Sequence, residues 1–182
     1  IEGLRRIAAS NGMEVEQLAP RIDTIVHGTT VTTNAVLTRG GAAVGLLTTE
    51  GVRDALEMRR GIREEQYNNR FLNVVPLVPR CLRRPVRGRL DYRGVEIEPL
   101  DRDGVRQACR LLREAGVEAV AICFMNAFAN PAHEVAAAEI VRSELPGAYL
   151  SVSSQVLPTI RFYNRVSTTV LNAYVGPVLG DY

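Results

Sequence analysis

The sequence predicts an α/β protein with a mixed, largely parallel sheet, flanking helices and one β-hairpin. Two nearly continuous apolar runs, 42–48 and 117–124, are typical of strands buried on both faces of a parallel sheet. Segments with apolar residues three and four positions apart alternate with such runs through short loops, as expected for α/β units. The stretch 86–100 alternates apolar and polar residues around Arg93-Gly94, which predicts the hairpin.

Residues that start and stop helices place the elements along the chain. Asp101 predicts the start of a helix that Gly116 ends, and Pro131 predicts the start of another. The stretch 61–84 has little periodicity, which indicates a long surface connection. The expected helices are at about 1–11, 30–37, 50–59, 101–115, 131–145 and 162–178, and the expected strands are at about 22–26, 42–48, 117–124 and 149–156.

Composition excludes several classes of protein. With 182 residues, 46% of them hydrophobic and 23% charged, and a formal net charge of +2, the chain resembles one globular domain. Its apolar runs fall far short of the ~18 residues that a membrane span needs. Aromatic residues make up 5%, and acidic residues are interspersed among the basic ones, which argues against a nucleic-acid surface. We therefore expect a single domain over 1–182 that binds neither membrane nor nucleic acid.

The cysteines and the first residue bear on the cellular compartment. Cys109 lies on the apolar face of an expected helix and Cys123 in an apolar strand, so both are expected in the core. Together with Cys81 they have the spacing of neither a disulfide framework nor a zinc site. The absence of a signal peptide or lipidation motif favours a cytoplasmic protein. Because the chain begins at Ile1 rather than Met, we expect a processed or excised piece.

The sharpest local pattern is the polar segment HGTTVTTN, where the expected strand 22–26 gives way to a helix. A helix N-terminus offers free N–H groups and a partial positive charge to anions, and Gly28 lets a ligand approach the backbone. Alternatively, the threonines only cap and pack the helix, and the residues by themselves leave both interpretations open. The ligand-binding candidates in this segment are His27, Gly28, Thr29, Thr30, Thr33 and Asn34.

Three arginines, Arg59, Arg60 and Arg63, lie where the expected helix 50–59 leads into the long connection. One interpretation is a clamp for a substrate carboxylate or phosphate. The other is that cations are simply favoured at the C-terminus of a helix. We keep Arg59 and Arg60 as ligand-binding candidates, assign no catalytic residue and predict no metal site.

Two further places invite a structural interpretation. In the helix that Pro131 opens, we expect His133 to pack or hydrogen-bond, and Glu134 to interact favourably with the helix dipole. At the start of the helix 162–178, one interpretation is that some of Arg161, Tyr163, Asn164 and Arg165 face a cleft. We favour the other, in which the apolar face of this helix is a domain contact that is exposed in this chain.

Several stretches together resemble the amino-terminal region of the hydantoinase A and 5-oxoprolinase family. They keep their order and spread over nearly the whole chain, so the match is specific as a set. The stretches are His27–Leu37, Gly45–Asp54, Glu57–Arg60, Asn130–Glu134, Ser153–Pro158 and Arg165–Val175.

The resemblance implies part of an actin-like (ribonuclease H-like) ATPase domain, with ATP and Mg²⁺ in a cleft between two α/β domains. It implies that the parent protein opens a cyclic amide, such as a hydantoin or 5-oxoproline, after phosphoryl activation has supplied a leaving group. Whether a further catalytic metal takes part is left undetermined. The alternatives are a subunit of an ATP-dependent acetone or acetophenone carboxylase, and a non-catalytic interaction module.

The resemblance also implies what lies outside the chain. Family members have an Asp-Gly-Gly-Thr type phosphate loop before the stretch that 1–11 resembles, and a large domain after the stretch that ends at 182. We expect both to be missing, so that 1–182 is a fragment that binds ATP weakly and turns over nothing. The expected partners are the cyclic amide substrate, the missing carboxy-terminal domain of the same chain, a hydantoinase B-type subunit and a second copy of the protein.

Overall fold

The computed structural model describes residues 2–26, 28–62 and 64–180, and its contacts divide the chain into two compact units, 1–30 and 31–182. The first unit contains α1 (Glu2–Ser10), α2 (Val15–Leu18) and the 3-10 turn η1 (Ala19–Arg21). Ala8 of α1 is buried, and Glu14 and Gln17 form a capping box at the start of α2. The helix expected at 1–11 is confirmed.

The strand expected at 22–26 is not formed, and that prediction is wrong. The segment has no ladder partner among the described residues, and Ile25 and Val26 are 63% and 93% exposed. β-branched residues favour an extended backbone, but a strand is stable only when a neighbouring strand binds its N–H and C=O groups.

The second unit is an α/β sandwich around a four-stranded parallel sheet in the order β2-β1-β5-β6. The predicted fold class is therefore confirmed. The strands are β1 (Val44–Thr49), β2 (Arg83–Val86), β5 (Ala119–Cys123) and β6 (Tyr149–Val152), with β3 (Arg89–Leu90) and β4 (Glu96–Glu98) in a separate antiparallel pair. The helices are α3 (Val31–Leu37), α4 (Ala55–Met58), α5 (Arg102–Glu114), α6 (Ala132–Glu144), α7 (Ser153–Val156) and α8 (Phe162–Gly180), with a 3-10 turn η2 (Arg80–Leu82) before β2.

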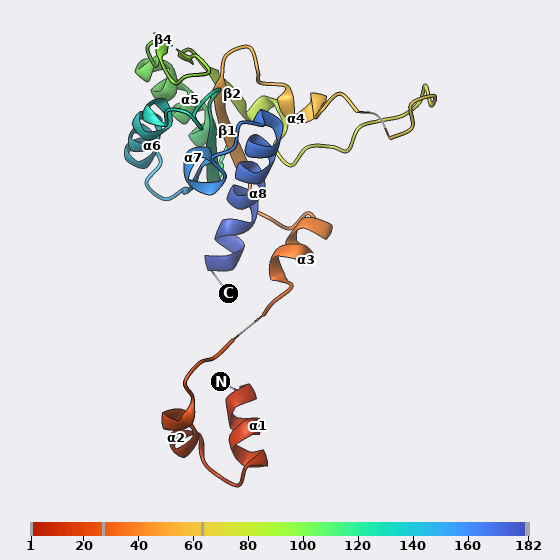
Figure 1. Cartoon of the computed structure of the whole chain (residues 1–182), viewed down its shortest axis with the longest axis vertical. Helices are drawn as coiled ribbons and strands as arrows, with labels where there is room; N and C mark the ends of the chain where they lie inside the picture. Colours follow the sequence, from red (N-terminus) through yellow and green to blue (C-terminus); the bar gives the residue numbers. More distant parts are fainter. Residues whose placement is uncertain (1, 27, 63, 181–182) are drawn as a thin grey trace. The chain divides into compact units, whose positions relative to one another are not determined.

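Alternation along the central strands builds a core on each face of the sheet. On one face, Leu47 and Ile122 pack against α5 and α6; on the other, Leu46 and Ala121 pack in a cluster with α8. Figure 1 shows α5 and α6 on one side of the sheet and α8 on the other. Burial on both faces explains why β1 and β5 read as continuous apolar runs. No helix among the described residues is both long and apolar enough to cross a bilayer.

The predicted helix boundaries are confirmed for α5 and α6. The Asp101 carboxylate accepts a hydrogen bond from the Gly104 N–H at 2.9 Å, and Gly116 ends α5 with a φ of +68°. Pro131 is the N-cap residue of α6. Cys109 and Cys123 are buried as expected, and burial raises the pKa of each thiol to about 11.

Three elements differ from the prediction. The helix expected at 50–59 is reduced to α4, because the chain turns at Gly51 with a φ of +89°. The strand expected at 149–156 ends at Val152, and 153–156 is the short helix α7. In the hairpin, the expected apolar face of Tyr92, Val95 and Ile97 is between 59% and 68% exposed, because only Leu90 of this pair of strands reaches the core.

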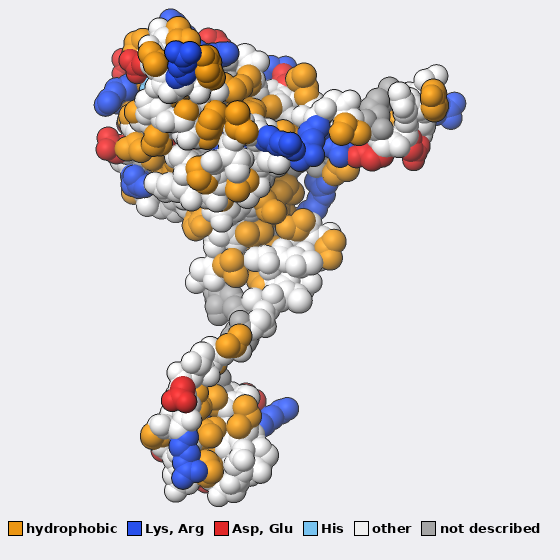
Figure 2. All heavy atoms as spheres, in the orientation of Figure 1, with side chains coloured by type: hydrophobic (Ala, Val, Ile, Leu, Met, Phe, Trp, Pro, Cys, Tyr) orange, Lys and Arg blue, Asp and Glu red, His pale blue; other side chains and the backbone are white. Residues whose placement is uncertain are grey.

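The long connection expected at 61–84 is confirmed up to η2. It extends away from the sheet between α4 and η2 (Figure 1), and Figure 2 shows apolar, basic and acidic side chains along it. Tyr67 and Leu72 are 92% and 86% exposed. The connection begins at the arginines that the sequence analysis singled out.

Candidate functional site

Arg59 stands at the end of α4, on the loop that follows the carboxyl end of β1. Its backbone N–H donates to the Ala55 carbonyl at 2.9 Å, and its φ of 54° and ψ of −124° lie in a region that side-chain-bearing residues rarely adopt. Such a conformation costs on the order of 1–3 kcal/mol and persists only where the surrounding structure holds it. The side chain reaches Tyr163 in the first turn of α8.

The Arg59 guanidinium is held from two sides. It forms an ion pair with Glu64, and a hydrogen bond with Tyr163 of α8 also raises its pKa. The same pair lowers the pKa of Glu64. The Nη1 nitrogen of Arg59 is buried without a hydrogen-bond partner among the described residues. A buried donor without a partner is unfavourable, so an added acceptor at this nitrogen would stabilise the site.

A cavity of about 510 Å³ opens beside Arg59, and we call it the Arg59 hollow. α3, α4, α8 and the long connection supply its walls. The lining is mostly apolar, with Arg39, Arg59, Tyr163 and Ser167 as its polar members and Val36, Leu37, Leu56, Val74, Val75, Pro76, Leu77 and Val170 as the rest. An apolar cavity with a few polar groups is the usual form of a small-molecule site.

Arg60 fastens the same loop to α8. Its Nη2 donates to the Asn164 Oδ1 at 2.7 Å, and a second cavity of about 310 Å³ lies between Arg59, Arg60, Ile62, Glu64 and Tyr163. The two arginines that the sequence singled out are therefore brought together, next to the first turn of α8. The sequence analysis did not connect them with Tyr163 or Asn164, because the two segments lie about a hundred positions apart.

Asp54 is the centre of a second group of ion pairs, with Arg53, Arg80 and Arg83. The Arg80 Nε and Nη2 donate to its two carboxylate oxygens at 3.0 and 3.2 Å, Arg53 donates at 3.4 Å, and the buried Arg83 Nη1 lies 3.7 Å away. The hydrogen bonds from Arg80 first, and then from Arg53, lower the pKa of Asp54 to about 2. Arg83 also pairs with Glu57 of α4 at 3.3 Å. The network ties α4 to the segment that enters β2.

We expect the Asp54 network to make stability depend on pH in the acid range. A carboxyl whose pKa falls on folding stabilises the protein above its unfolded pKa of about 3.8, and that contribution disappears as the pH falls through about 2. In urea denaturation, the difference between the parent chain and Asp54→Asn should hold steady from pH 7 to 5. It should then shrink between pH 4 and 2.

Arg80→Gln serves as the control for this titration, because Arg80 is the main cause of the lowered pKa. In the Arg80→Gln background, the substitution Asp54→Asn should show a much weaker pH dependence. An unchanged pH dependence in that background would rule out the ion pair as its origin.

The polar segment 27–34 is divided between the two units. His27 lies outside the described residues, Gly28, Thr29 and Thr30 are exposed in the first unit, and Thr33 and Asn34 are exposed on α3. α3 enters the Arg59 hollow through its apolar residues Val36 and Leu37, not through Thr33 or Asn34. Ligand binding by the segment 27–34 remains a prediction.

Two residues that the sequence analysis interpreted as structural meet at the end of β5. The buried Glu134 accepts hydrogen bonds from the Phe124 N–H at 2.8 Å, the Ser153 hydroxyl at 2.5 Å and the Ser154 N–H at 2.8 Å. The buried Arg165 donates to the Phe124 carbonyl from the other side. Glu134 lies in the first turn of α6, as expected, and it is also fully buried. The apolar face of α8 is not exposed either, because it packs against the sheet.

His133 has the packing role that was expected of it. Its ring is buried, and its Nε2 lies 2.7 Å from the Glu96 Oε2 of β4. The contact joins α6 to the hairpin, away from the Arg59 hollow.

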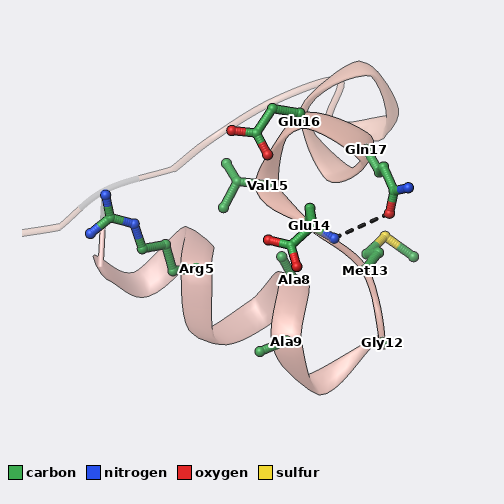
Figure 3. A pocket seen from close by; sticks show the side chains of 9 residues that line it. All are labelled: Arg5, Ala8, Ala9, Gly12, Met13, Glu14, Val15, Glu16 and Gln17. Carbon is green, nitrogen blue, oxygen red and sulfur yellow. Dashed lines mark hydrogen bonds between the residues drawn. The ribbon is translucent and has the colours of Figure 1, made fainter.

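The first unit has a hollow of its own, which Figure 3 shows between α1 and α2. Its volume is about 660 Å³, and it is lined by residues between Arg5 and Gln17. No candidate from the sequence lies in it. Among the described residues, no group of three or more His, Cys, Asp and Glu side chains is placed to hold a metal ion. Of the two hollows, the Arg59 hollow is the one that contains a residue singled out from the sequence.

Two curated proteins are similar to most of the chain. It is 42% identical, over 99% of its length, to the caprolactamase subunit alpha of Pseudomonas jessenii, and 38% identical, over 90%, to the acetophenone carboxylase gamma subunit of Aromatoleum aromaticum. It covers 26% and 24% of these relatives, so the chain spans about a quarter of their length.

Two solved structures match the fold closely. The crystal structure of the ATP-dependent caprolactamase from P. jessenii superposes with a TM-score of 0.90 over all of this chain and 26% of that one, at 42% identity. A nucleotide-free acetone carboxylase superposes with a TM-score of 0.89 over 97% of this chain and 27% of that one, at 28% identity. The family model of the hydantoinase/oxoprolinase N-terminal region matches residues 1–145, and this chain belongs to that family.

Proposed function

We propose that this chain is the amino-terminal quarter of an ATP-dependent enzyme that activates the carbonyl group of a cyclic amide for ring opening. The observation that carries the proposal is the likeness to the caprolactamase subunit alpha, at 42% identity over nearly the whole chain with a TM-score of 0.90. The Arg59 hollow supports it, because a mostly apolar cavity with two guanidinium groups and two hydroxyl groups suits a small ring that carries a carbonyl.

The described residues do not form a complete site for ATP with Mg²⁺. No acidic cluster among them fits a metal ion, and the Arg59 and Arg60 guanidinium groups already bind Glu64 and Asn164. We therefore assign nucleotide and metal binding to the part of the relatives' length that this chain does not span. ATP would supply phosphoryl activation of the substrate there, and a B-type subunit or a second copy would join the carboxy-terminal domain as partners.

The 182-residue chain alone should accordingly bind ATP weakly. In isothermal titration with MgATP we expect no saturation below the millimolar range, and no phosphate release over hours. Micromolar affinity would show that this chain holds a complete nucleotide site and would overturn the assignment.

Phosphate release by the parent polypeptide, with its partner subunit, tests the proposed function. ε-Caprolactam, hydantoin and 5-oxoproline would be offered one at a time with MgATP, and the ring-opened acid would be quantified by mass spectrometry. We expect at least one cyclic amide to stimulate ATP hydrolysis several-fold, with its ring-opened product formed. If none does, the proposal is wrong.

A ketone carboxylase is the second candidate, because the acetophenone carboxylase gamma subunit is 38% identical to the chain. Acetophenone and acetone would therefore be tested with bicarbonate in the same assay. Formation of a carboxylated ketone, without ring opening of any amide, would favour this candidate. If neither the amides nor the ketones stimulate ATP hydrolysis or yield a product, the non-catalytic interaction module would be favoured.

A further inference from the structure

We propose that the Arg59 hollow is the substrate subsite of the parent enzyme, and that it takes a neutral carbonyl compound with an apolar body. The apolar body would lie between α3, α8 and the long connection, and the carbonyl oxygen would accept hydrogen bonds from Arg59 and Tyr163. This inference rests on the proposed function and names the residues of this chain that would recognise the substrate.

The walls of the hollow call for an apolar ligand. Leu37, Val74 and Val75 are 77%, 71% and 67% exposed, although all three line a concave surface. Exposed apolar residues that gather around a cavity mark a binding site. At about 510 Å³, the hollow lies within the range of about 300–1,000 Å³ that is usual for small-molecule sites.

The donor side of the hollow is incomplete. The Arg59 Nη1 has no acceptor among the described residues, and the guanidinium forms a hydrogen bond with Tyr163. Arg59 and Tyr163 both line the cavity, and the planar guanidinium presents several N–H donors. A carbonyl oxygen entering the hollow would supply the missing acceptor.

The charge balance favours a neutral ligand over an anion. The Glu64 carboxylate already pairs with Arg59, so an entering carboxylate or phosphate would have to compete with it. Arg39 donates to the Val75 carbonyl at 3.2 Å at the exposed rim, where solvent screens its charge. A ketone or amide oxygen needs only a hydrogen-bond donor, not an unpaired positive charge. The clamp for a carboxylate or phosphate, one of the two interpretations that the sequence left open, stays a prediction.

Ligand titration of the 182-residue chain by NMR tests the subsite. The probes are ε-caprolactam and cycloheptanone as neutral carbonyl rings, and 5-oxoproline as an anionic one. We expect saturable shifts of the Arg59 Nε–H signal with both neutral rings, and at least tenfold weaker binding of 5-oxoproline. Absence of saturable shifts with either neutral ring, or tighter binding of 5-oxoproline, would overturn the inference.

Three variants locate the binding. Arg59→Gln should weaken binding of the neutral rings at least tenfold, and Tyr163→Phe about threefold. Arg110→Gln, an exposed arginine on α5 outside the hollow, should leave the dissociation constant within twofold. The urea midpoint of each variant reports whether it folds. Unchanged binding in folded Arg59→Gln would overturn the inference, as would equal losses in Arg59→Gln and Arg110→Gln.

Kinetics of the parent enzyme distinguish an error in the proposed subsite from an error in the proposed function. If cyclic amides drive ATP hydrolysis in the parent, Arg59→Gln should raise the KM for the amide at least tenfold and leave the KM for ATP within twofold. Turnover with both KM values unchanged would overturn the subsite alone. No turnover with any amide or ketone would overturn the proposed function, whatever the binding experiments on the chain show.

Discussion

Replacing Glu134 with alanine is expected to lower the free energy of unfolding by about 3–5 kcal/mol. The carboxylate is fully buried and accepts three hydrogen bonds, from the Phe124 N–H, the Ser153 hydroxyl and the Ser154 N–H. Alanine leaves these donors without an acceptor in the protein, at about 1–3 kcal/mol each before water enters the space. Urea denaturation followed by circular dichroism measures the loss.

Two matched variants show whether the loss comes from the hydrogen bonds. Glu139→Ala removes an exposed carboxylate from the same helix and should change stability by less than about 0.5 kcal/mol. Glu134→Gln keeps the shape of the side chain but turns an amide N–H₂ toward the donors, so it should retain only part of the stability. If Glu134→Ala costs no more than Glu139→Ala, the carboxylate does not hold this corner of the fold.

The position of Glu134 shows where prediction from the sequence stops. An acidic residue in the first turn of a helix fits the helix dipole, and nothing in the local pattern tells whether it faces solvent or core. The answer depends on β5 and α7, which place three donors around it from ten and twenty positions away. The same donors explain why the strand expected at 149–156 ends at Val152.

Elements whose stability is local were predicted well. α5 has an apolar stripe, an Asp101 cap and a Gly116 stop, and all three are features of neighbouring residues. The stretch 22–26 has strand-forming residues, but its strand needs a partner that the described residues do not provide. Prediction from local propensity was therefore correct for the helix α5 and wrong for the strand 22–26.

The candidate site was predicted in part for the same reason. A pair of arginines at the end of a helix is visible in the sequence, and the structure brings Arg59 and Arg60 together on one loop. Tyr163 and Ser167 of α8 complete the hollow, but they lie about a hundred positions away, and no local pattern links them to Arg59. Only the packing of α8 against the sheet shows that these residues belong together.

Replacing Arg165 with alanine is expected to lower the free energy of unfolding by about 3–5 kcal/mol. The substitution removes a buried side chain that donates hydrogen bonds to two backbone carbonyls. Arg165 donates to the Phe124 carbonyl and, at 3.2 Å, to the Thr159 carbonyl, and its guanidinium lies 5.7 and 5.5 Å from the ring centres of Phe128 and Phe162. Arg165→Met should cost less than Arg165→Ala, since methionine fills the space without a desolvated charge. A larger loss in Arg165→Met would contradict this account.

The strongest expectation is that the two buried residues act on each other through Phe124. Glu134 binds the N–H of this residue and Arg165 its C=O, so α6 and α8 hold the end of β5 from opposite sides. After one substitution has removed its hydrogen bond to Phe124, the second substitution should destabilise the protein less. The double variant should therefore lose about 0.5–3 kcal/mol less free energy of unfolding than the two single variants together. The control pair Glu139→Ala and Arg165→Ala should be additive within about 0.5 kcal/mol. Strict additivity of Glu134→Ala with Arg165→Ala would mean that β5 does not couple the helices, and that the start of α8, with Tyr163 and the Arg59 hollow, is positioned by α8 packing alone.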